Sequence, residues 1–386
     1  MPWSFGFVTA ALLAVIIYYL IPSDELFLQS NFSTLSSNLT IVITGANSGV
    51  GYATVEHLAK AGTAKIIILA CRNEMKCTNA KERAEAQLPT NSTTQLVTAK
   101  LDLSSRSSIE EFAKKELPEL LIQSQTQCVD TNDKMTIEPT IDVLVNNAGI
   151  FASNLNHTFI DGLEEHMFVN HLGHVLMMHF IWPILTKSQA RIVSISSISA
   201  LLPLRATAGW TPSDKLWSEF HPSVDGMLRY ARSKRANLFF AEELQRRYGS
   251  KPDDDSSPNS GTSSSLSSIS SVASHPGYTR TEIWSNGAKI FPKYAGKLIQ
   301  WNSVGSMSSP DGAKTQVWAA LDRHQVPGGT YVGPRWWLFG NPIGLGFIEQ
   351  QQSSNFPQHY WPSFEKRDEL WNKTMEALGI SIFGSS

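Results

Sequence analysis

The chain has 386 residues, with 34 acidic and 32 basic side chains, a formal net charge of -2 and 17% charged residues. This balance gives no reason to expect nucleic acid or an acidic surface as a partner, so we look for a small-molecule site. The length allows one large α/β domain or two smaller domains. The three cysteines, Cys71, Cys77 and Cys128, lack the C-x-x-C spacing of a zinc site. We interpret their odd number as an argument against a disulfide framework and for a reducing compartment.

Residues 5–21 are uncharged and almost wholly apolar, which is near the lower length limit of a membrane-spanning helix. The alternative is a cleaved signal peptide, but no basic segment precedes the run and no A-x-A type of cleavage site follows Leu20. We therefore predict a membrane anchor over residues 1–22, followed by a polar, Ser-rich linker over residues 23–38. The first basic residue is Lys60, so charge gives little guidance about orientation.

The first predicted strand, residues 41–43, runs into a glycine-rich turn with the pattern G-x-x-x-G-x-G. Glycines let the backbone turn tightly and approach a ligand, and apolar residues at helical spacing from Tyr52 onward indicate that a helix follows. The positive end of that helix favours a pyrophosphate, although an ordinary strand-to-helix loop would show the same pattern. The candidate cofactor-binding residues of the turn are Gly45, Asn47, Ser48, Gly49, Val50 and Gly51.

The second predicted strand, residues 65–70, is followed by Arg72, which lies 21 residues after Gly51. An acidic side chain at this place would accept hydrogen bonds from the 2′-hydroxyl of NAD, whereas an arginine suits the 2′-phosphate of NADP. No Asp or Glu occurs between Lys65 and Asn73, so NADP(H) is favoured. The alternative is that Arg72 is a solvated loop residue.

A helix is predicted over residues 75–88 and a strand over residues 94–100, which leads into Asp102 and Leu103. Asp102 could accept a hydrogen bond from the adenine amino group of a cofactor, or it could cap a helix over residues 105–117. The sequence leaves both interpretations of Asp102 open.

Residues 141–149 form another predicted buried strand, which ends in two asparagines, an alanine and a glycine. Side-chain amides there can tie neighbouring strand ends together, and the small Ala148 and Gly149 leave room for a cofactor ribose next to Asn147. The following helix holds Asn170, with histidines around it at positions 166, 171 and 174. No carboxylate or cysteine joins these histidines at ligand spacing, so no metal site is predicted.

A strand over residues 191–195 leads to a serine pair that includes Ser197, and a long irregular segment rich in Pro, Gly and Trp follows over residues 199–228. Loops of this length are usually functional or disordered, and the apolar content favours a substrate cover. A helix then begins with Tyr230, and the i, i+4 spacing places Lys234 on the same face of that helix.

Two segments are expected to be surface insertions: residues 118–140, with two prolines, and the low-complexity residues 249–268. After the second insertion, a strand over residues 270–274 ends in a turn at which the backbone and a threonine hydroxyl could meet a carboxamide. The candidate residues of this turn are Pro276, Gly277, Thr279 and Thr281. The remaining predicted elements are a helix over residues 310–321, a strand over 328–334 and an amphipathic helix over 364–378, with an aromatic cluster of Trp336, Trp337, Phe339 and Phe347 that we expect in the core.

The predicted chemistry centres on Tyr230, because a tyrosine has a reference pKa of about 10 and needs its anion stabilised to act as an acid or base near neutral pH. A cation one helical turn away does so, and Lys234 is that cation. The Ser197 hydroxyl could hold a substrate carbonyl or alcohol oxygen next to the tyrosine, and Asn170 could position a water that relays protons to the lysine. The hydride itself would move to or from a nicotinamide, so the protein orients and polarises.

Several motifs occur in a fixed order along the chain: TGANSGVG (44–51), NNAG (146–149), Asn170, the serine of SISS (194–197), YARSK (230–234) and HPGYTRT (275–281). In this order they resemble the short-chain dehydrogenase/reductase family. Within that family, TGANSGVG together with LACRN (69–73), VNHLGH (169–174), SKRAN (233–237) and ELWNKTMEALG (369–379) is similar to the retinol dehydrogenase and WW-domain oxidoreductase branch. The resemblance covers about residues 38–380.

The resemblance implies a catalytic tetrad of Asn170, Ser197, Tyr230 and Lys234. It also implies that Tyr230 and Lys234 contact the cofactor, that Arg72 selects NADP(H), and that Ser197 rather than Ser196 is the active serine. Members of the branch often carry an N-terminal endoplasmic-reticulum anchor, with the catalytic domain facing the cytosol, and act on lipophilic alcohols or carbonyls. The spacing of 33 residues from Ser197 to Tyr230 is longer than is common in the family, so the substrate loop is specific to this protein.

We therefore predict one Rossmann-type, doubly wound parallel sheet with helices on both faces over residues 39–380, preceded by the anchor and linker. The predicted function is that of an NADP(H)-dependent oxidoreductase that interconverts an alcohol and a carbonyl on a lipophilic molecule of the retinoid, steroid or lipid aldehyde class. The alternatives are a carbon–carbon double-bond reductase, like the light-driven pigment reductases, and a catalytically idle scaffold or sensor that binds NADP(H). No nucleic-acid partner is expected, and the oligomeric state stays open, a homodimer included.

Overall fold

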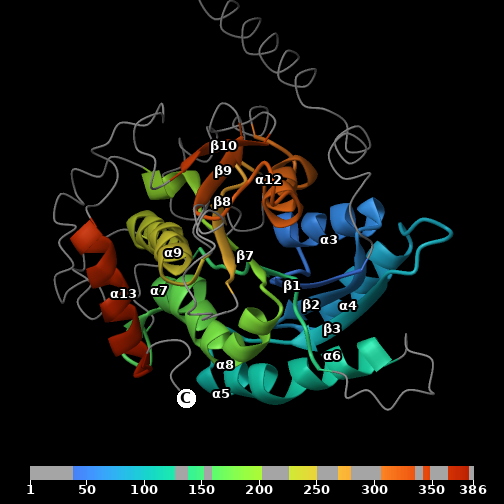
Figure 1. Ribbon diagram of the computed structural model, residues 1–386, viewed down its shortest axis with the longest axis horizontal. Helices are drawn as coiled ribbons and strands as arrows, with labels where there is room; N and C mark the ends of the chain where they lie inside the picture. Colours follow the sequence, from blue (N-terminus) through green and yellow to red (C-terminus); the bar gives the residue numbers. More distant parts are fainter. Residues whose placement is uncertain are drawn as a thin grey trace, which may run out of the picture.

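The computed structural model describes residues 38–126, 138–151, 159–201, 226–249, 268–279, 306–334, 342–347 and 364–381. Among these residues the main element is an eight-stranded sheet in the order β10-β9-β8-β7-β4-β1-β2-β3, shown in Figure 1. All neighbouring strands pair in parallel except β9 and β10, which are antiparallel. The strands are β1 Leu39–Thr44, β2 Ala64–Cys71, β3 Gln95–Lys100, β4 Val143–Asn146, β7 Arg191–Ile195, β8 Ser270–Ser274, β9 Thr330–Pro334 and β10 Pro342–Phe347, with a small separate hairpin of β5 Phe159–Ile160 and β6 Leu163–Glu164.

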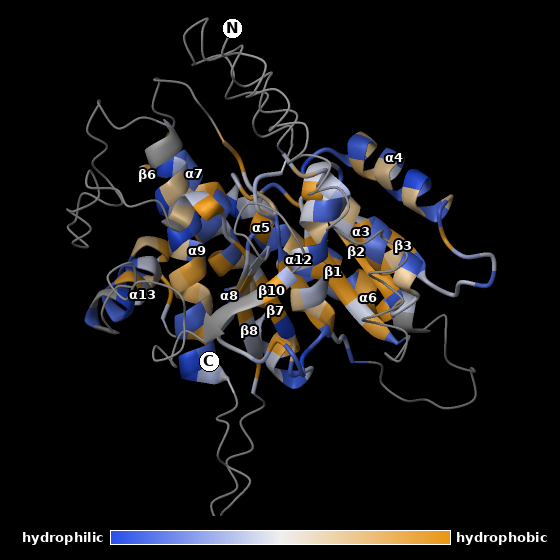
Figure 2. Ribbon diagram, turned by 90° about the horizontal axis from the view of Figure 1, so that it is seen from above, coloured by the Kyte–Doolittle hydropathy of each residue, from blue (hydrophilic) through white to orange (hydrophobic). Residues whose placement is uncertain are grey.

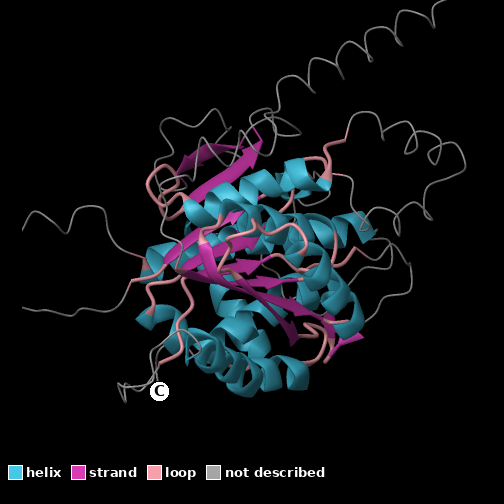
Figure 3. Cartoon of the chain, turned by 90° about the vertical axis from the view of Figure 1, so that its right-hand side faces the viewer, coloured by secondary structure: helices cyan, strands magenta, loops and turns pink. Residues whose placement is uncertain are grey.

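Helices cover both faces of this sheet, as the predicted doubly wound architecture requires (Figures 1 and 3). One face carries α3 Gly49–Ala61, α4 Glu74–Glu85 and α12 Ser309–Leu321. The other face carries α5 Arg106–Glu111, η1 Phe112–Glu116, α6 Leu117–Thr126, α7 Glu165–Met167, η2 Phe168–Leu172, α8 Gly173–Lys187, η3 Ile198–Leu201 and α9 Gly226–Tyr248. The last helix, α13 Phe364–Leu378, packs on the outer side of α9. The predicted Rossmann-type sheet is therefore confirmed.

The apolar strands owe their composition to burial on both faces of the sheet, visible as the hydrophobic centre of Figure 2. In β1, Ile41 and Ile43 belong to the core beneath α3, α4 and α12, whereas Val42 points into the core beneath α5, α8 and α9. This alternation is the period of a β-strand, in which successive side chains point to opposite faces. Each central strand therefore connects two separate hydrophobic cores, and its carboxyl end is held firmly in place.

The stretch Glu165–Lys187 is long and apolar enough to cross a membrane, but 78% of its most apolar window is buried inside the domain. A core helix passes such a test because it is surrounded by apolar side chains. We therefore assign it to the core of the domain. The predicted anchor, residues 1–22, and the linker lie outside the described residues.

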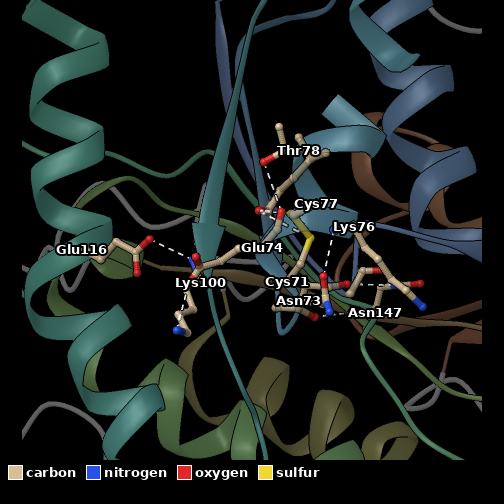
Figure 4. The surroundings of a disulfide bond; sticks show 12 residues. Cys71, Asn73, Glu74, Lys76, Cys77, Thr78, Lys100, Glu116 and Asn147 are labelled. Atoms are coloured by element: carbon tan, nitrogen blue, oxygen red, sulfur yellow. Dashed lines mark hydrogen bonds and ion pairs between the residues drawn. A yellow bond between two sulfur atoms is a disulfide. The ribbon is translucent and has the colours of Figure 1, made fainter. Parts of the chain in front are cut away.

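The structure corrects the interpretation of the cysteines, because Cys71 and Cys77 form a disulfide (Figure 4). Cys71 ends β2 and Cys77 lies in the first turns of α4, so the turn between them brings the two Cα atoms to 5.9 Å. An odd total argues against a complete framework but not against one local pair. Cys128 lies outside the described residues.

Two predicted element boundaries are also wrong. Residues 118–126 are helical as part of α6, so the first insertion is not a loop throughout, because the apolar Leu121 packs into the core. The helix that carries Tyr230 begins earlier, at Gly226. The antiparallel strand β10 was not expected, and it includes Phe347 of the predicted aromatic cluster.

Several predictions fall outside the described residues, among them the substrate cover between 202 and 225 and the aromatic residues Trp336, Trp337 and Phe339. The low-complexity insertion lies there too, but its two ends are described. Gly249 and Ile269 pair as a parallel bridge, so the chain returns to the place where it left the domain.

Candidate functional site

The glycine turn joins β1 to α3 and has the close backbone contacts that the sequence predicts. Gly45 and Gly49 have φ angles of 65° and 57°, in the region that favours glycine. A Cβ atom on Gly51 would lie 2.5 Å from the Gly45 carbonyl oxygen and would collide with the Asn147 amide. Helix α3 begins at Gly49, and its N-cap residue Ser48 makes no side-chain capping bond. The first amides of α3 therefore face a place where a phosphate fits.

A second set of contacts ties the carboxyl ends of β1 and β4 together. The Thr44 hydroxyl accepts hydrogen bonds from the backbone amides of Asn147 and Ala148, at 3.0 and 2.9 Å. The Asn147 side-chain amide donates to the Thr44 carbonyl oxygen at 2.8 Å. The predicted role of an asparagine amide as a tie between strand ends is therefore confirmed for Asn147.

A cavity of about 520 Å³ opens at this edge of the sheet. Its walls include all the residues predicted from the glycine turn and from the ends of β2, β3 and β4: Gly45, Asn47, Ser48, Gly49, Val50, Gly51, Arg72, Asp102, Leu103, Asn147, Ala148 and Gly149. Sequence reasoning missed further wall residues: Thr44, Ala70, Asn73, Lys76, Leu101, Ser104, Ile150, Phe151 and Val169. Most of these directly adjoin a predicted residue, and this adjacency was the signal available in the sequence.

The far end of the cavity is basic. Arg72 and Lys76 both line it, together with Asn73, whose side chain accepts a hydrogen bond from the backbone amide of Lys76 and so caps α4. Lys76 lies in the first turn of α4, directly after the turn that holds Arg72, and this closeness in sequence was the available signal.

Asp102 does not cap the helix that follows it. Ser105 is the N-cap of α5 and accepts a hydrogen bond from the backbone amide of Ser108, whereas Asp102 accepts bonds from the amide and hydroxyl of Ser104. The capping alternative is therefore wrong, and the carboxylate lies in the cavity wall.

Tyr230, Ser197 and Lys234 lie together beyond the inner end of the cavity. The Ser197 hydroxyl faces the Tyr230 hydroxyl, and the Lys234 ammonium lies 5.8 Å from the centre of the tyrosine ring. Tyr230 is 7% exposed and Lys234 is 3% exposed. These three residues are not part of the cavity wall, but a Cβ atom on Gly149 would lie 3.1 Å from Lys234 Nζ. The cavity and the buried triad therefore meet at Gly149.

Burial determines the protonation of these groups, in a direction opposite to the one expected for the tyrosine. It raises the pKa of Tyr230 to about 12, and the hydrogen bond with Ser197 only partly offsets this rise. It lowers the pKa of Lys234 to about 8. Both shifts favour the neutral form of the side chain. The Tyr230 phenol therefore keeps a proton that it can donate, and the Lys234 ammonium loses a proton more easily than a solvated lysine does.

The two adjacent serines have different partners. The Ser196 hydroxyl donates to the backbone carbonyl of Lys234 at 2.8 Å and lies near the Tyr331 phenol, whose pKa burial raises. The Ser197 hydroxyl faces Tyr230 and accepts a bond from the backbone amide of Ser199 at 3.2 Å. Only the second serine of the pair therefore reaches the tyrosine hydroxyl.

Asn170 is fully buried in η2 and acts as a clamp between segments. Its side-chain oxygen accepts from the Ile150 amide at 2.7 Å, and its side-chain nitrogen donates to the Ile150 carbonyl and to the Ser233 hydroxyl. Both amide hydrogens of Asn170 are thus used by protein groups, so a water at this side chain could bond only to Oδ1. A Cβ on Gly149 would lie 3.2 Å from that oxygen, next to Lys234 Nζ.

The turn after β8 does not contribute to the cavity wall. Gly277 has a φ angle of 73°, and the Thr279 hydroxyl donates to the Pro276 carbonyl at 2.7 Å. Thr279 also packs so closely on Gly312 that a Cβ there would collide with it. The predicted Thr281 lies outside the described residues, so this turn is the least defined part of the predicted site.

No group of three or more His, Cys, Asp or Glu side chains with metal-binding geometry occurs among the described residues. The three histidines near Asn170 bond to protein groups instead. His166 pairs with the buried Glu164 at 2.6 Å, His171 contacts Asn237 and Thr374, and His174 contacts Thr44.

Comparison with known proteins identifies the family. A short chain dehydrogenase family model matches residues 39–213. Human retinol dehydrogenase 11 is 31% identical over 381 residues, which is 96% of each chain, and mouse retinol dehydrogenase 14 is 32% identical over 291 residues, 73% of each chain. An uncharacterized protein from Mycobacterium paratuberculosis has the same fold, with a TM-score of 0.57 and 24% identity over 92% of this chain and 99% of that one. The chain belongs to the short-chain dehydrogenase/reductase family, in its retinol dehydrogenase-like branch.

Proposed function

We propose that this protein is an NADP(H)-dependent oxidoreductase that interconverts an alcohol and a carbonyl on a lipophilic small molecule. The observation that carries the proposal is the buried triad at the end of the cavity: a tyrosine hydroxyl that faces a serine hydroxyl, with an ammonium on the same helical face. The family is one of oxidoreductases. The substrate class, the cofactor and the roles of individual residues are our proposal.

The cavity suits a dinucleotide because glycines, which have no side chains, line the part of the wall where its phosphates would lie. A side chain on Gly51 would fill the cradle, and the first turn of α3 offers free amides and no acidic residue. Arg72 and Lys76 would hold a 2′-phosphate, since both line the cavity, whereas Glu74 between them is not part of its wall and pairs with Lys100. When bound, the nicotinamide would supply or accept the hydride.

In the direction of reduction, the proposed role of Tyr230 is to donate its proton to the substrate oxygen. Because its pKa is raised, the Tyr230 phenol is protonated near neutral pH and has a proton to donate to the substrate oxygen. The Ser197 hydroxyl would hold the same oxygen at the tyrosine. Lys234 would stabilise the phenolate that remains and return a proton to it, a task that suits an ammonium with a pKa of about 8. Asn170 would keep the segment around Ile150 in register with α9.

The apolar side chains at the inner end of the cavity support a lipophilic substrate. Ile150, Phe151 and Val169 line this end, and the Phe151 ring meets the Tyr230 ring edge-on at 5.3 Å. The similar proteins are named as retinol dehydrogenases, which points in the same direction. We extend the proposal to a membrane anchor over residues 1–22 in the endoplasmic reticulum, with the catalytic domain facing the cytosol.

The test uses the full-length chain with NADPH and all-trans-retinal, a steroid ketone and a long-chain aldehyde as probes. We expect at least one probe to be reduced with matching oxidation of NADPH. Tyr230→Phe should keep NADPH binding, measured by fluorescence titration, while turnover falls by about 10²- to 10⁴-fold. Absence of NADPH binding, or equal turnover by wild type and Tyr230→Phe across the panel, would end the proposal.

A further inference from the structure

A chain of buried hydrogen bonds runs from the C-terminal helix α13 to the lysine of the triad. It begins at Thr374, which is fully buried in α13, and the Thr374 hydroxyl contacts His171 Nε2 at 3.2 Å. His171 Nδ1 contacts the Asn237 side-chain oxygen at 3.1 Å. The Asn237 amide nitrogen in turn contacts two backbone carbonyl oxygens, those of Asn170 at 2.9 Å and Ile195 at 3.1 Å.

The direction of every bond in this chain follows from donor and acceptor chemistry. Two carbonyl oxygens face one end of the Asn237 amide, so that end is the nitrogen and the other end can only accept. His171 Nδ1 must therefore carry the proton. Because burial lowers the pKa of His171 to about 4, the ring is neutral near pH 7, and Nε2 must accept from the Thr374 hydroxyl. The hydrogen bonds all point from α13 toward the site.

The chain of hydrogen bonds ends on the Ile195 carbonyl, which also accepts a hydrogen bond from the Lys234 ammonium. Lys234 Nζ donates to the Ile195 carbonyl oxygen at 3.1 Å, so Asn237 and Lys234 share this acceptor. Ile195 is the last residue of β7, two positions before Ser197. A shift of this carbonyl would move the lysine and the serine of the triad together.

His174 supports the second carbonyl in the same way. The Thr44 hydroxyl oxygen already accepts two backbone amides, so His174 Nε2 is the acceptor in their contact at 2.9 Å, which is shorter than the contact of the same hydroxyl with the Val145 carbonyl at 3.4 Å. The proton on His174 Nδ1 then goes to the Asn170 carbonyl at 3.2 Å. The Asn170 carbonyl therefore receives hydrogen bonds both from the cofactor end of β1 and from the chain that starts in α13.

We propose that α13 is part of the active site, with Thr374, His171 and Asn237 as positioning residues that hold the Ile195 carbonyl and thereby the Lys234 ammonium. This inference rests on the proposed function and adds a role for a segment about 140 residues after the triad lysine. The role is separable from docking, because α13 has other anchors. Trp371 stacks on Phe240 with ring centres 4.8 Å apart, and the Arg247 guanidinium lies over Trp371.

The test compares Thr374→Val with Thr374→Ser and with Leu370→Val in the full-length chain. Valine keeps the shape but removes the hydroxyl that contacts His171 Nε2, and serine keeps that hydroxyl. Leu370→Val disturbs the packing of α13 but changes no residue of the hydrogen-bond chain. With NADPH and whichever probe aldehyde or ketone the wild type reduces, we expect kcat to fall by about tenfold in Thr374→Val at nearly unchanged KM. Thr374→Ser should restore it, and Leu370→Val should leave kcat within about twofold of wild type at a similar loss of thermal stability.

The tautomer of His171 gives a readout that does not depend on turnover. It is measured by NMR from the ring ¹⁵N chemical shifts of protein labelled with ¹⁵N-histidine. The His171 signals are assigned as those that disappear in His171→Asn. We expect the proton on Nδ1 in wild type. A proton on Nε2 would overturn the inference, and so would equal kcat losses in Thr374→Val and Leu370→Val. A wild type inactive on every probe would overturn the proposed function and this inference with it. Wild-type turnover that Thr374→Val leaves unchanged would overturn the inference alone.

Discussion

The proposed cofactor half of the site, around the glycine turn, and the proposed catalytic half, around the triad, are built in different ways. The glycine turn, Arg72 and Lys76 lie within one β-α-β-α stretch, and the turn packs against one further segment, Asn147 and Ala148 at the end of β4. The catalytic half joins β7, α9, η2 and α13 through bonds between residues 39 to 203 positions apart. A local turn tolerates change elsewhere in the chain, whereas a triad assembled across four elements depends on each of them.

The sharpest way to test this contrast is a change inside the triad. Ser197→Ala removes the hydroxyl that bonds to Tyr230, and we expect kcat to fall by about 10²-fold, as for loss of one donor to a reacting oxygen. The matched control, Ser196→Ala, removes a bond to the Lys234 backbone and should mainly cost stability, about 1 kcal/mol. Steady-state kinetics and thermal unfolding of both variants measure this. A larger kcat loss in the Ser196 variant would reverse the assignment of the two serines.

Substitutions in the proposed cofactor half should change the affinity for NADPH and not the rate of the chemical step. Gly51→Ala places a methyl group against Asn147 and the Gly45 carbonyl, which we expect to weaken NADPH binding by about tenfold or more and to cost about 1–3 kcal/mol of stability. Gly62→Ala is the control, because Gly62, unlike Gly51, has a positive φ, and it has open space around it at the other end of α3, outside the cavity wall. It should lose stability while NADPH affinity, followed by fluorescence, stays at the wild-type value. Equal NADPH affinity in Gly51→Ala and Gly62→Ala would contradict the proposal that the glycine turn holds the cofactor phosphates.

Cofactor selection should reside in the two cations after β2. Arg72→Ala and Lys76→Ala are each expected to lower kcat/KM for NADPH by about tenfold, since each removes a charged partner of the 2′-phosphate, and to leave kcat/KM for NADH nearly unchanged. Kinetics with both cofactors measure the ratio. Lys81→Ala, on the same helix but outside the cavity wall, is the control. A parallel loss with NADH would show that these residues do not read the 2′-phosphate.

The last prediction concerns stability and not activity: an acid sensitivity that comes from three buried histidines, His171, His174 and His275. Burial lowers the pKa of His171 to about 4 and the pKa values of His174 and His275 to about 3, below the unfolded value of about 6.5. The unfolded chain then binds protons first as the pH falls. Stability is therefore full above about pH 6.5 and falls below it, by up to about 1.4 kcal/mol per pH unit for each histidine.

Urea unfolding at several pH values between 7.5 and 5 measures this slope. His275→Gln should make the slope shallower, whereas His324→Gln, at an exposed position, should leave it unchanged. Equal slopes in wild type and His275→Gln would contradict the assignment.

The disulfide poses a separate question about compartment. Cys71 and Cys77 bracket the residues proposed to bind the 2′-phosphate, and disulfides persist mainly in oxidising compartments, whereas the proposed orientation faces the reducing cytosol. Protease protection in intact microsomes, combined with thiol labelling of Cys71 and Cys77, distinguishes the two orientations. A protected domain with both cysteines oxidised would place the catalytic domain in the lumen.

The sequence by itself determined the alternation of strands and helices, the glycine turn and the cavity wall. The first two depend on residues close together in the chain: apolar runs make strands buried on both faces, and glycines allow the positive φ angles of the turn. The cavity wall follows because the carboxyl ends of parallel strands meet at one edge of the sheet. It could not reveal the Cys71–Cys77 bond, the direction of the Tyr230 pKa shift or the partners of Ser196 and Ser197. These depend on burial and on atoms that only folding brings together, as does the path from Thr374 to Lys234. Local sequence patterns carry no information about which distant side chain removes a group from water or shares its hydrogen bond.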